Sequence, residues 1–191
     1  MDYNQARMEF EQYLNDYDRT DGKVKLKITH TYGVVARSGQ IAERMGLSAE
    51  DRELAKMIAL LHDIGKTKEL SAFPMNDYTD DGQLLGHIMI GAERIHDKAG
   101  EIPGFPKKLE SELKHCILAH HGELEYGSPK KPALPEALAL NLADNTDAKM
   151  ETLTEMFASA GQQKEWIGYN RLFESNFRKS SCEQEGGVHG I

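Results

Sequence analysis

The chain has 191 residues, of which 23 are Lys or Arg and 31 are Asp or Glu, so its formal net charge is −8. This length suits one domain with a short appendage, and the acidic balance argues against a broad nucleic-acid-binding surface. No run approaches the roughly 18 apolar residues that a membrane-spanning helix needs. No secretory signal is visible, and the two cysteines form neither a disulfide framework nor a CxxC metal site. We therefore expect a cytoplasmic protein with no membrane contact.

Apolar residues recur with helical spacing along nearly the whole chain, and strand-like alternation is scarce. We predict an all-α fold with helices over residues 3–17, 26–45, 48–61, 82–98 and 107–121, a helix that begins at Pro135, and a helix over 163–177 around Trp166. In the helix that begins at Pro135, we expect Leu138, Leu142 and Asp144 to point inward. Residues 71–82 and 122–134 hold the turn-forming residues and predict loops. The expected organisation is an N-terminal helix within residues 1–25 that packs on the domain or on a partner, a main domain over 26–178, and a disordered tail over 179–191.

The histidines and two aspartates indicate the chemistry. Five of the eight histidines fall in apolar helices or at helix ends: His30, His62, His87, His120 and His121. Asp63 directly follows His62, and Asp144 lies in an apolar run. Charged carboxylates in such surroundings are costly unless they are paired or bound to a cation. The pairs His62-Asp63 and His120-His121 each lie within three residues of a glycine, Gly65 or Gly122, that can release the helix and let both side chains face one centre.

The number of candidate ligands predicts two metal ions. Five imidazoles and two carboxylates exceed the three or four protein ligands of a single catalytic site. We expect Asp63 to bridge two ions roughly 3.5–4 Å apart. Mixed nitrogen and oxygen ligands suit Mn, Fe, Co, Ni or Zn, and a hydroxide held by such ions attacks phosphorus. Lys66 could reach a substrate phosphate, or could be a simple helix-end cation.

The order of these residues resembles a known family. His30, then His62-Asp63-Ile64-Gly65-Lys66, and finally Asp144 resemble the H…HD…D signature of the HD superfamily of metal-dependent phosphohydrolases. His87 and His120-His121 resemble the extra histidines of its two-metal branch. The runs LLHDIGKTKEL, LLGHI, HHGELEYGSP and LADNTDA are most similar to the HD domain of YhaM-type 3′-5′ exoribonucleases, over about residues 28–150. The resemblance implies a helical HD bundle. It also implies that His30, His62, Asp63 and Asp144 hold one ion, and that His87, His120 and His121 hold the other with Asp63 between them.

We therefore expect a metal-dependent phosphohydrolase in which Asp63 and Lys66 take part in cleaving a phosphomonoester or phosphodiester, with a nucleotide or short oligonucleotide as substrate. YhaM-type enzymes have an OB-type domain before the HD domain, whereas few residues precede His30 here. Together with the net charge of −8, this makes long nucleic acid an unexpected substrate. The sequence lacks the Gly-Tyr-Pro motif of the family's two-metal cyclic-di-nucleotide phosphodiesterases, which argues against cyclic-di-GMP as the substrate but not against other nucleotides. A non-catalytic sensor or binding module and a dinuclear-iron oxygenase are the alternatives, and oligomerisation stays open.

Other residues have both structural and functional interpretations. His96, His115 and His189 match no motif position, and Cys116 is expected to be a small buried residue. Glu123 and Glu125 are expected to belong to a solvated loop face, with contact to a metal-bound water or a third ion as the alternative. Ser128, Lys130 and Lys131 could form a lip over the site that contacts a substrate phosphate. The Tyr126 ring could stack on a base or could anchor its own loop.

Overall fold

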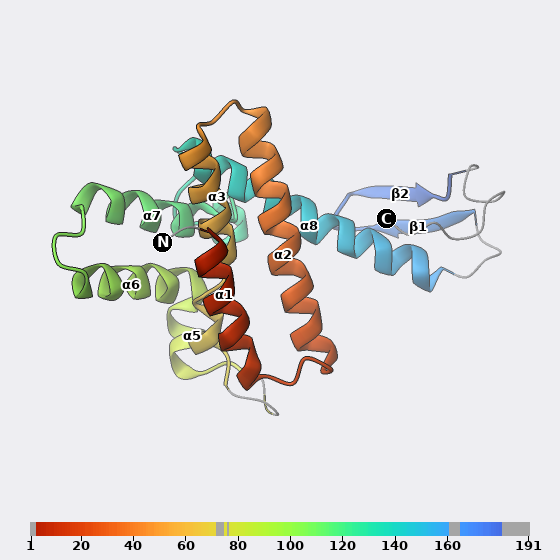
Figure 1. Ribbon diagram of the computed structural model, residues 1–191. Coiled ribbons are helices and arrows are strands. Elements are labelled where there is room, and N and C mark those ends of the chain that lie inside the picture. Colours follow the sequence, from red (N-terminus) through yellow and green to blue (C-terminus); the bar gives the residue numbers. More distant parts are fainter. Residues whose placement is uncertain (1–2, 72–74, 76, 161–164, 181–191) are drawn as a thin grey trace. The chain divides into compact units, whose positions relative to one another are not determined.

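Figure 1 shows the computed structural model, which describes residues 3–71, 75, 77–160 and 165–180. The helices are α1 Tyr3–Tyr13, α2 Gly22–Arg44, α3 Ala49–Leu61, α4 Lys66–Glu69, α5 Asp80–Leu84, α6 Gly86–Glu101, α7 Lys107–Ala119 and α8 Pro135–Ser159, with short 3-10 turns η1 Leu14–Asp16 and η2 Leu124–Tyr126. Two short strands, β1 Trp166–Asn170 and β2 Ser175–Arg178, follow. The predicted all-α class is confirmed.

The chain divides into two compact units, residues 1–147 and residues 148–191. The first unit contains α1 to α7 and the beginning of α8, and the second contains the rest of α8 with β1 and β2. Within the first unit, α2 packs along α3 and α6 packs along α7 (Figure 1). None of the helices in the described ranges has the length and apolar character that crossing a membrane requires.

Local capping residues place the ends of several helices. The Asp21 side chain accepts hydrogen bonds from the backbone N–H groups of Lys23 and Val24, so α2 begins four residues earlier than the predicted residue 26. The Ser48 hydroxyl accepts from the backbone N–H of Asp51, as its position before α3 predicts. These caps satisfy backbone donors that a helix start otherwise leaves without partners.

The predicted helix over residues 82–98 is interrupted. Residues 80–84 form α5, and Gly86 then adopts φ +72°, a left-handed conformation that ends α5 and lets α6 start in a new direction. The Thr79 hydroxyl accepts from the backbone N–H of Gly82 at 2.9 Å, so the helix starts inside the predicted 71–82 loop. Residues 72–74 and 76 of that loop lie outside the described residues.

Small residues form much of the core of the first unit. The buried cluster comes from α2, α3, α7 and α8: Val34, Val35, Ile58, Ala59, Leu60, Cys116, Ala137, Leu140 and Ala143. Leu138 and Leu142 are 41% and 42% exposed, so the prediction that they point inward is wrong. The inward face of α8 contains Leu140 and alanines, whose small side chains let α8 approach its neighbours closely. Asp144 lies four residues after Leu140, on this same face.

The predicted helix over residues 163–177 is wrong where the structure describes it. Residues 166–178 form an antiparallel hairpin in which Trp166 pairs with Arg178 and Asn170 with Ser175. Trp166, Phe173 and Phe177 also fit helical spacing, which explains the error. Aromatic residues favour strands, and the Asn170 side chain accepts from the backbone N–H of Leu172 to shape the turn. Residues 163 and 164, and 181–191 of the predicted tail, lie outside the described residues.

Gly65 is needed for a close backbone contact rather than for a special backbone conformation. Its φ of −63° is helical, so it does not end α3 in the way predicted. A Cβ at this position would collide with the backbone carbonyl oxygen of His87 on α6. The turn that follows α3 can therefore approach α6 only without a side chain here.

We expect Gly65→Ala to lower the free energy of unfolding by about 1–3 kcal/mol or more, because the new methyl group meets fixed backbone. The matched control is Gly100→Ala on α6, where a Cβ has nothing within 4 Å. That control should be neutral or stabilise by up to about 1 kcal/mol, because Ala favours the helix. Urea unfolding of the two variants measures the difference, and equal stabilities would contradict this account of Gly65.

Candidate metal centre

The structure brings all seven predicted ligand residues together. They come from five places in the first unit: His30 on α2, His62 and Asp63 after α3, His87 on α6, His120 and His121 after α7, and Asp144 on α8. Six of the seven residues form two groups, and within each group the candidate ligand atoms lie within 4.8 Å of one another. The first group is His30, His62 and Asp144, and the second group is His87, His120 and His121. We call the five histidines together the histidine cluster.

The adjacent pairs reach the centre because each begins at the end of a helix. His62 and His120 are the C-cap residues of α3 and α7. Each uses its Nδ1 to contact the carbonyl oxygen three residues earlier, on Ala59 and on Ile117, at 2.7 Å. These carbonyls belong to the last turn of a helix, where acceptors lack partners within the helix. The same local arrangement thus positions one histidine of each group.

Asp63 faces both groups with different oxygens. Its Oδ2 lies 3.6 Å from Nε2 of His62, and its Oδ1 lies 3.7 Å from Nε2 of His87. His62 belongs to the first group and His87 to the second. The first group is itself compact, since Oδ1 of Asp144 lies 3.2 Å from Nε2 of His30 and 3.8 Å from Nε2 of His62. Asp63 therefore lies beside both groups, with one oxygen near each.

Every ring in the histidine cluster forms a hydrogen bond between its Nδ1 atom and an oxygen atom. The acceptors are Asp147 Oδ2 for His30, Ala59 O for His62, Glu69 Oε1 for His87, Ile117 O for His120 and Tyr126 O for His121, at 2.7 to 3.1 Å. Carbonyl and carboxylate oxygens only accept, so Nδ1 bears the proton in each ring. In the neutral rings Nε2 therefore carries a lone pair. This arrangement is typical of metal-binding histidines, whose other nitrogen is held by an oxygen.

Several polar atoms at the centre are buried without a hydrogen-bond partner among the described residues. They are Nε2 of His62, His87 and His120, and Oδ1 of Asp63. A buried polar atom left without a partner costs about 1–3 kcal/mol. All four are lone-pair donors, so a divalent cation is the kind of group that satisfies them together. The residues present therefore fit metal ions.

Electrostatics keeps most of these side chains in the form that binds metal. Burial acts to raise the pKa of Asp63, but the positive charge of Lys66, which also donates a hydrogen bond to this carboxylate, holds that pKa far below its usual value. Asp144 likewise has a lowered pKa against burial, through its hydrogen bond with His30. Burial lowers the pKa values of His87 and His120, which favours neutral imidazole. The hydrogen bond to Asp144 raises the pKa of His30 instead.

Sequence reasoning missed the residues that orient the histidines. Asp147, three residues after Asp144 on α8, accepts from His30 Nδ1 at 2.7 Å and from the Arg37 guanidinium. Glu69 accepts from the backbone N–H of His87 at 2.9 Å and contacts its ring nitrogen at 3.1 Å. The spacing of Asp147 could have indicated its role, because residues three apart on a helix share a face. No pattern pointed to Glu69.

Lys66 lies at the edge of the centre. Its Nζ contacts Oδ2 of Asp63 at 2.6 Å, and the charge of Asp63 raises the pKa of Lys66 although burial acts in the opposite direction. The ammonium group therefore remains protonated beside the candidate ligands. Lys27, one turn before His30 on α2, was not predicted. Burial and the nearby charge of Lys66 lower its pKa.

The other singled-out residues have structural partners. His96 Nδ1 lies 2.6 Å from Glu110 Oε1, and His115 Nε2 accepts from the backbone N–H of Ala133. His189 lies outside the described residues. Cys116 is buried as predicted, and burial raises the pKa of its thiol to about 12.

The loop after α7 corrects one prediction. The buried Ser128 hydroxyl donates to backbone carbonyls of Leu118 and Lys130, so Ser128 cannot line a phosphate-contacting lip. Lys131 Nζ contacts Glu123 Oε2 at 2.5 Å, which matches the solvated-face interpretation of Glu123.

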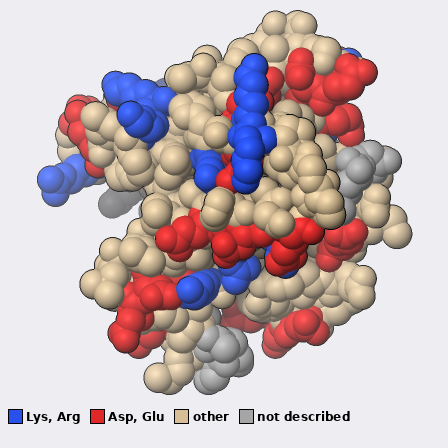
Figure 2. Space-filling view, turned by 90° about the vertical axis from the view of Figure 1, so that its left-hand side faces the viewer, with Lys and Arg blue, Asp and Glu red and all other residues tan. Residues whose placement is uncertain are grey.

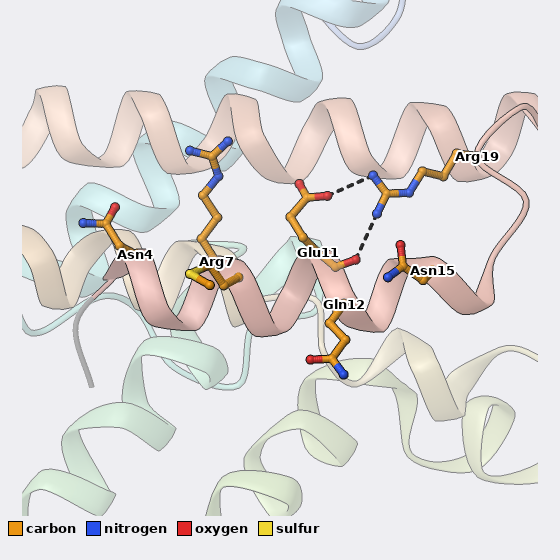
Figure 3. A pocket seen from close by; sticks show the side chains of 7 residues that line it. Asn4, Arg7, Glu11, Gln12, Asn15 and Arg19 are labelled. Carbon is orange, nitrogen blue, oxygen red and sulfur yellow. Dashed lines mark hydrogen bonds and ion pairs between the residues drawn. The ribbon is translucent and has the colours of Figure 1, made fainter.

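A separate hollow of about 750 Å³ runs along α1 (Figure 3). Its two arginines are engaged, since Arg19 contacts the Glu11 carboxylate and backbone oxygen at 2.9 Å, and Arg7 lies 5.6 Å from the centre of the Tyr32 ring. No member of the histidine cluster lines it. The hollow is therefore distinct from the candidate metal centre.

Comparison with known proteins agrees with this geometry. The family model described as "HD domain" matches residues 28–149. The chain is 44% identical over 107 residues to the 3′-5′ exoribonuclease YhaM of Bacillus subtilis, 45% over 104 residues to that of Bacillus velezensis, and 44% over 103 residues to that of Halalkalibacterium halodurans.

These alignments cover 54%, 52% and 54% of this chain but 32% of each relative. The chain thus spans about a third of the length of the curated relatives it matches. No solved structure gives a significant match.

Replacing Asp147 by Asn tests how His30 is oriented. The amide removes the negative charge from the acceptor of His30 Nδ1, and we expect metal affinity to fall roughly 10- to 100-fold. Competition with a chromophoric chelator measures the affinity, and Asp97→Asn on the exposed surface of α6 is the matched control. An Asp147→Asn protein that binds metal as tightly as the control would show that this contact has no role in binding.

Proposed function

The chain belongs to the HD domain family, and from this premise we propose that it is a metal-dependent phosphohydrolase. The proposed reaction is hydrolysis of a phosphomonoester or phosphodiester in a nucleotide or short oligonucleotide. The observation that supports it most is the convergence of lone pairs at one buried centre, where several Nε2 atoms and Asp63 Oδ1 lack partners among the described residues. Protein interiors rarely leave such atoms without a function.

In this proposal the two groups hold two divalent ions. His30, His62 and Asp144 would hold one ion, His87, His120 and His121 would hold the other, and Asp63 would contribute to both. Imidazole and carboxylate ligands suit Mn, Fe, Co, Ni or Zn. Such ions, when bound, supply a nucleophilic hydroxide at neutral pH and stabilise charge that develops on a phosphoryl group.

The chain's own residues supply orientation and positive charge. Asp147 and Glu69 hold His30 and His87 in position, and the backbone carbonyls hold the other three rings. Lys66 keeps its proton beside Asp63, where its ammonium group can attract and orient a substrate phosphate. A group held ready in this way stabilises charge without having to reorganise during the reaction.

The relatives' name supports a nucleotide-containing substrate. Those proteins are 3′-5′ exoribonucleases, and this chain corresponds to about a third of their length. We favour a short substrate because of the net charge of −8. On the face shown in Figure 2, clusters of Lys and Arg side chains are interrupted by Asp and Glu. Long nucleic acids bind best where positive charge is continuous along the phosphates.

Asp63→Ala tests the shared-ligand role. Losing a carboxylate that serves both groups should lower metal retention and should lower kcat/KM by at least about a hundredfold. Elemental analysis measures the metal content, and a panel of phosphoesters with added Mn²⁺ measures turnover. Asp97→Ala is the control.

The results separate the alternatives. A variant that keeps both ions and full turnover contradicts the proposed role of Asp63. Oxygen consumption by an iron-loaded wild type, without phosphoester cleavage, favours a dinuclear-iron oxygenase. Metal retention with neither activity favours a binding module.

Lys66→Met tests the proposed phosphate contact. We expect kcat/KM on phosphoesters to fall roughly 100-fold because one preorganised cationic donor is lost, with Lys66→Arg recovering part of it. Lys68→Met is the matched control, since Lys68 lies on the same short helix but pairs with Asp81 on the exposed surface. Steady-state kinetics of the three variants measures the effect. Equal losses at Lys66 and Lys68 would be inconsistent with a specific contact.

A further inference from the structure

The turn η2 is joined directly to the candidate metal centre. It follows His121 and Gly122, and its last residue is Tyr126. The backbone carbonyl of Tyr126 accepts from Nδ1 of His121 at 2.9 Å, and His121 belongs to the second group. The backbone of Tyr126 is therefore one imidazole ring away from the atoms that would hold an ion.

Contacts that do not involve the Tyr126 ring hold this turn in place. The Tyr126 backbone N–H donates to the carbonyl oxygen of Glu123 at 3.1 Å, and the Gly127 N–H donates to that of Leu124 at 3.0 Å. Gly127 adopts the left-handed φ of +81° that this turn requires. Ser128, which follows Gly127, is buried, and its hydroxyl donates to the backbone carbonyl of Leu118 at the end of α7. The ring is therefore not needed to anchor its own loop, which was one of its two predicted roles.

The Tyr126 side chain projects into solvent. It is 60% exposed, and it makes no hydrogen bond, ring contact or ion pair with any described residue. Among the other tyrosines of this unit, Tyr13 contacts Tyr17 and Tyr32 contacts Glu11 and Phe10, whereas Tyr78 is exposed to a similar degree. A single exposed aromatic residue is ordinary by itself. Tyr126 differs from such residues because its own backbone is held by hydrogen bonds and its carbonyl contacts a candidate metal ligand, so the exposed ring is attached next to the second group.

We propose that Tyr126 is a nucleobase-stacking subsite of this centre. The inference rests on the proposed phosphohydrolase function: a phosphate at the second group places the attached nucleoside beside η2. Stacking on a tyrosine ring accepts any base, because every base has a π face. The subsite would therefore favour nucleotides over other phosphoesters without selecting one base by hydrogen bonds.

The test compares matched substrates that differ only in a base. The substrates are an adenine dinucleotide with a 3′-5′ phosphodiester, and two analogues in which one or the other nucleoside is abasic. The proteins are metal-loaded wild type, Tyr126→Ala, Tyr126→Phe and, as the matched control, Leu124→Ala, whose side chain is 62% exposed in the same turn.

We expect Tyr126→Ala to raise KM for the dinucleotide roughly 5- to 100-fold with little change in kcat, the range that loss of one stacked base implies. Tyr126→Phe should keep the wild-type KM. Wild type should show a similarly raised KM on the analogue that lacks the stacked base. On that analogue, Tyr126→Ala should have the same KM as wild type. Leu124→Ala should resemble wild type throughout.

A second readout does not require turnover. A phosphorothioate dinucleotide containing 2-aminopurine should lose fluorescence on binding to wild type and Tyr126→Phe, and should keep it with Tyr126→Ala. Unchanged KM and quenching in Tyr126→Ala overturn the subsite and leave the hydrolase standing. The subsite is also overturned if Leu124→Ala raises KM as much as Tyr126→Ala does. The same holds if Tyr126→Ala raises KM equally on the dinucleotide and on both abasic analogues, because either result indicates a disturbed loop.

Failure of the proposed function is distinguishable from failure of the subsite. Quenching that depends on Tyr126 in a wild type that cleaves no phosphoester supports the subsite and rejects the hydrolase. A wild type that neither cleaves nor quenches rejects both.

Discussion

The contacts between histidine Nδ1 atoms and oxygens are the constraint on which the centre depends. In each of the five rings this contact assigns a proton to Nδ1, so in the neutral ring the lone pair lies on Nε2. Three of the acceptors are backbone carbonyls, which cannot change charge or move independently of the helices. The secondary structure itself therefore sets the orientation of His62, His120 and His121.

The rest of the first unit serves this arrangement. Alanines on α8 allow the helix that contains Asp144 to approach its neighbours, and the absence of a side chain at Gly65 lets the turn with His62 and Asp63 lie against α6. Close packing of this kind transmits small changes, because an interior near crystal density has little room to relax. Substitutions in the core should therefore alter metal binding as well as stability.

The sequence could predict most of the helices, because helical spacing is a local signal, and the site residues, because their H…HD…D order resembles a known family. The membership of the family is confirmed by the match over residues 28–149. What failed depends on tertiary contacts. Leu138 and Leu142 have the right chemistry for a core, but α8 turns its smaller side chains inward. Trp166 and Phe177 fit a helix in spacing and form strands instead.

Asp63 has one oxygen toward each group, so in the proposed two-ion centre both ions would draw on the charge of the same carboxylate. The first ion to arrive would neutralise much of the carboxylate's charge, so the second would meet a weaker electrostatic attraction. Two unequal loading steps would follow, and protein with a single ion would be a distinct species whose abundance depends on the supply of metal. Mixed pairs of ions would then form, because the second position could be taken by whichever ion is more abundant.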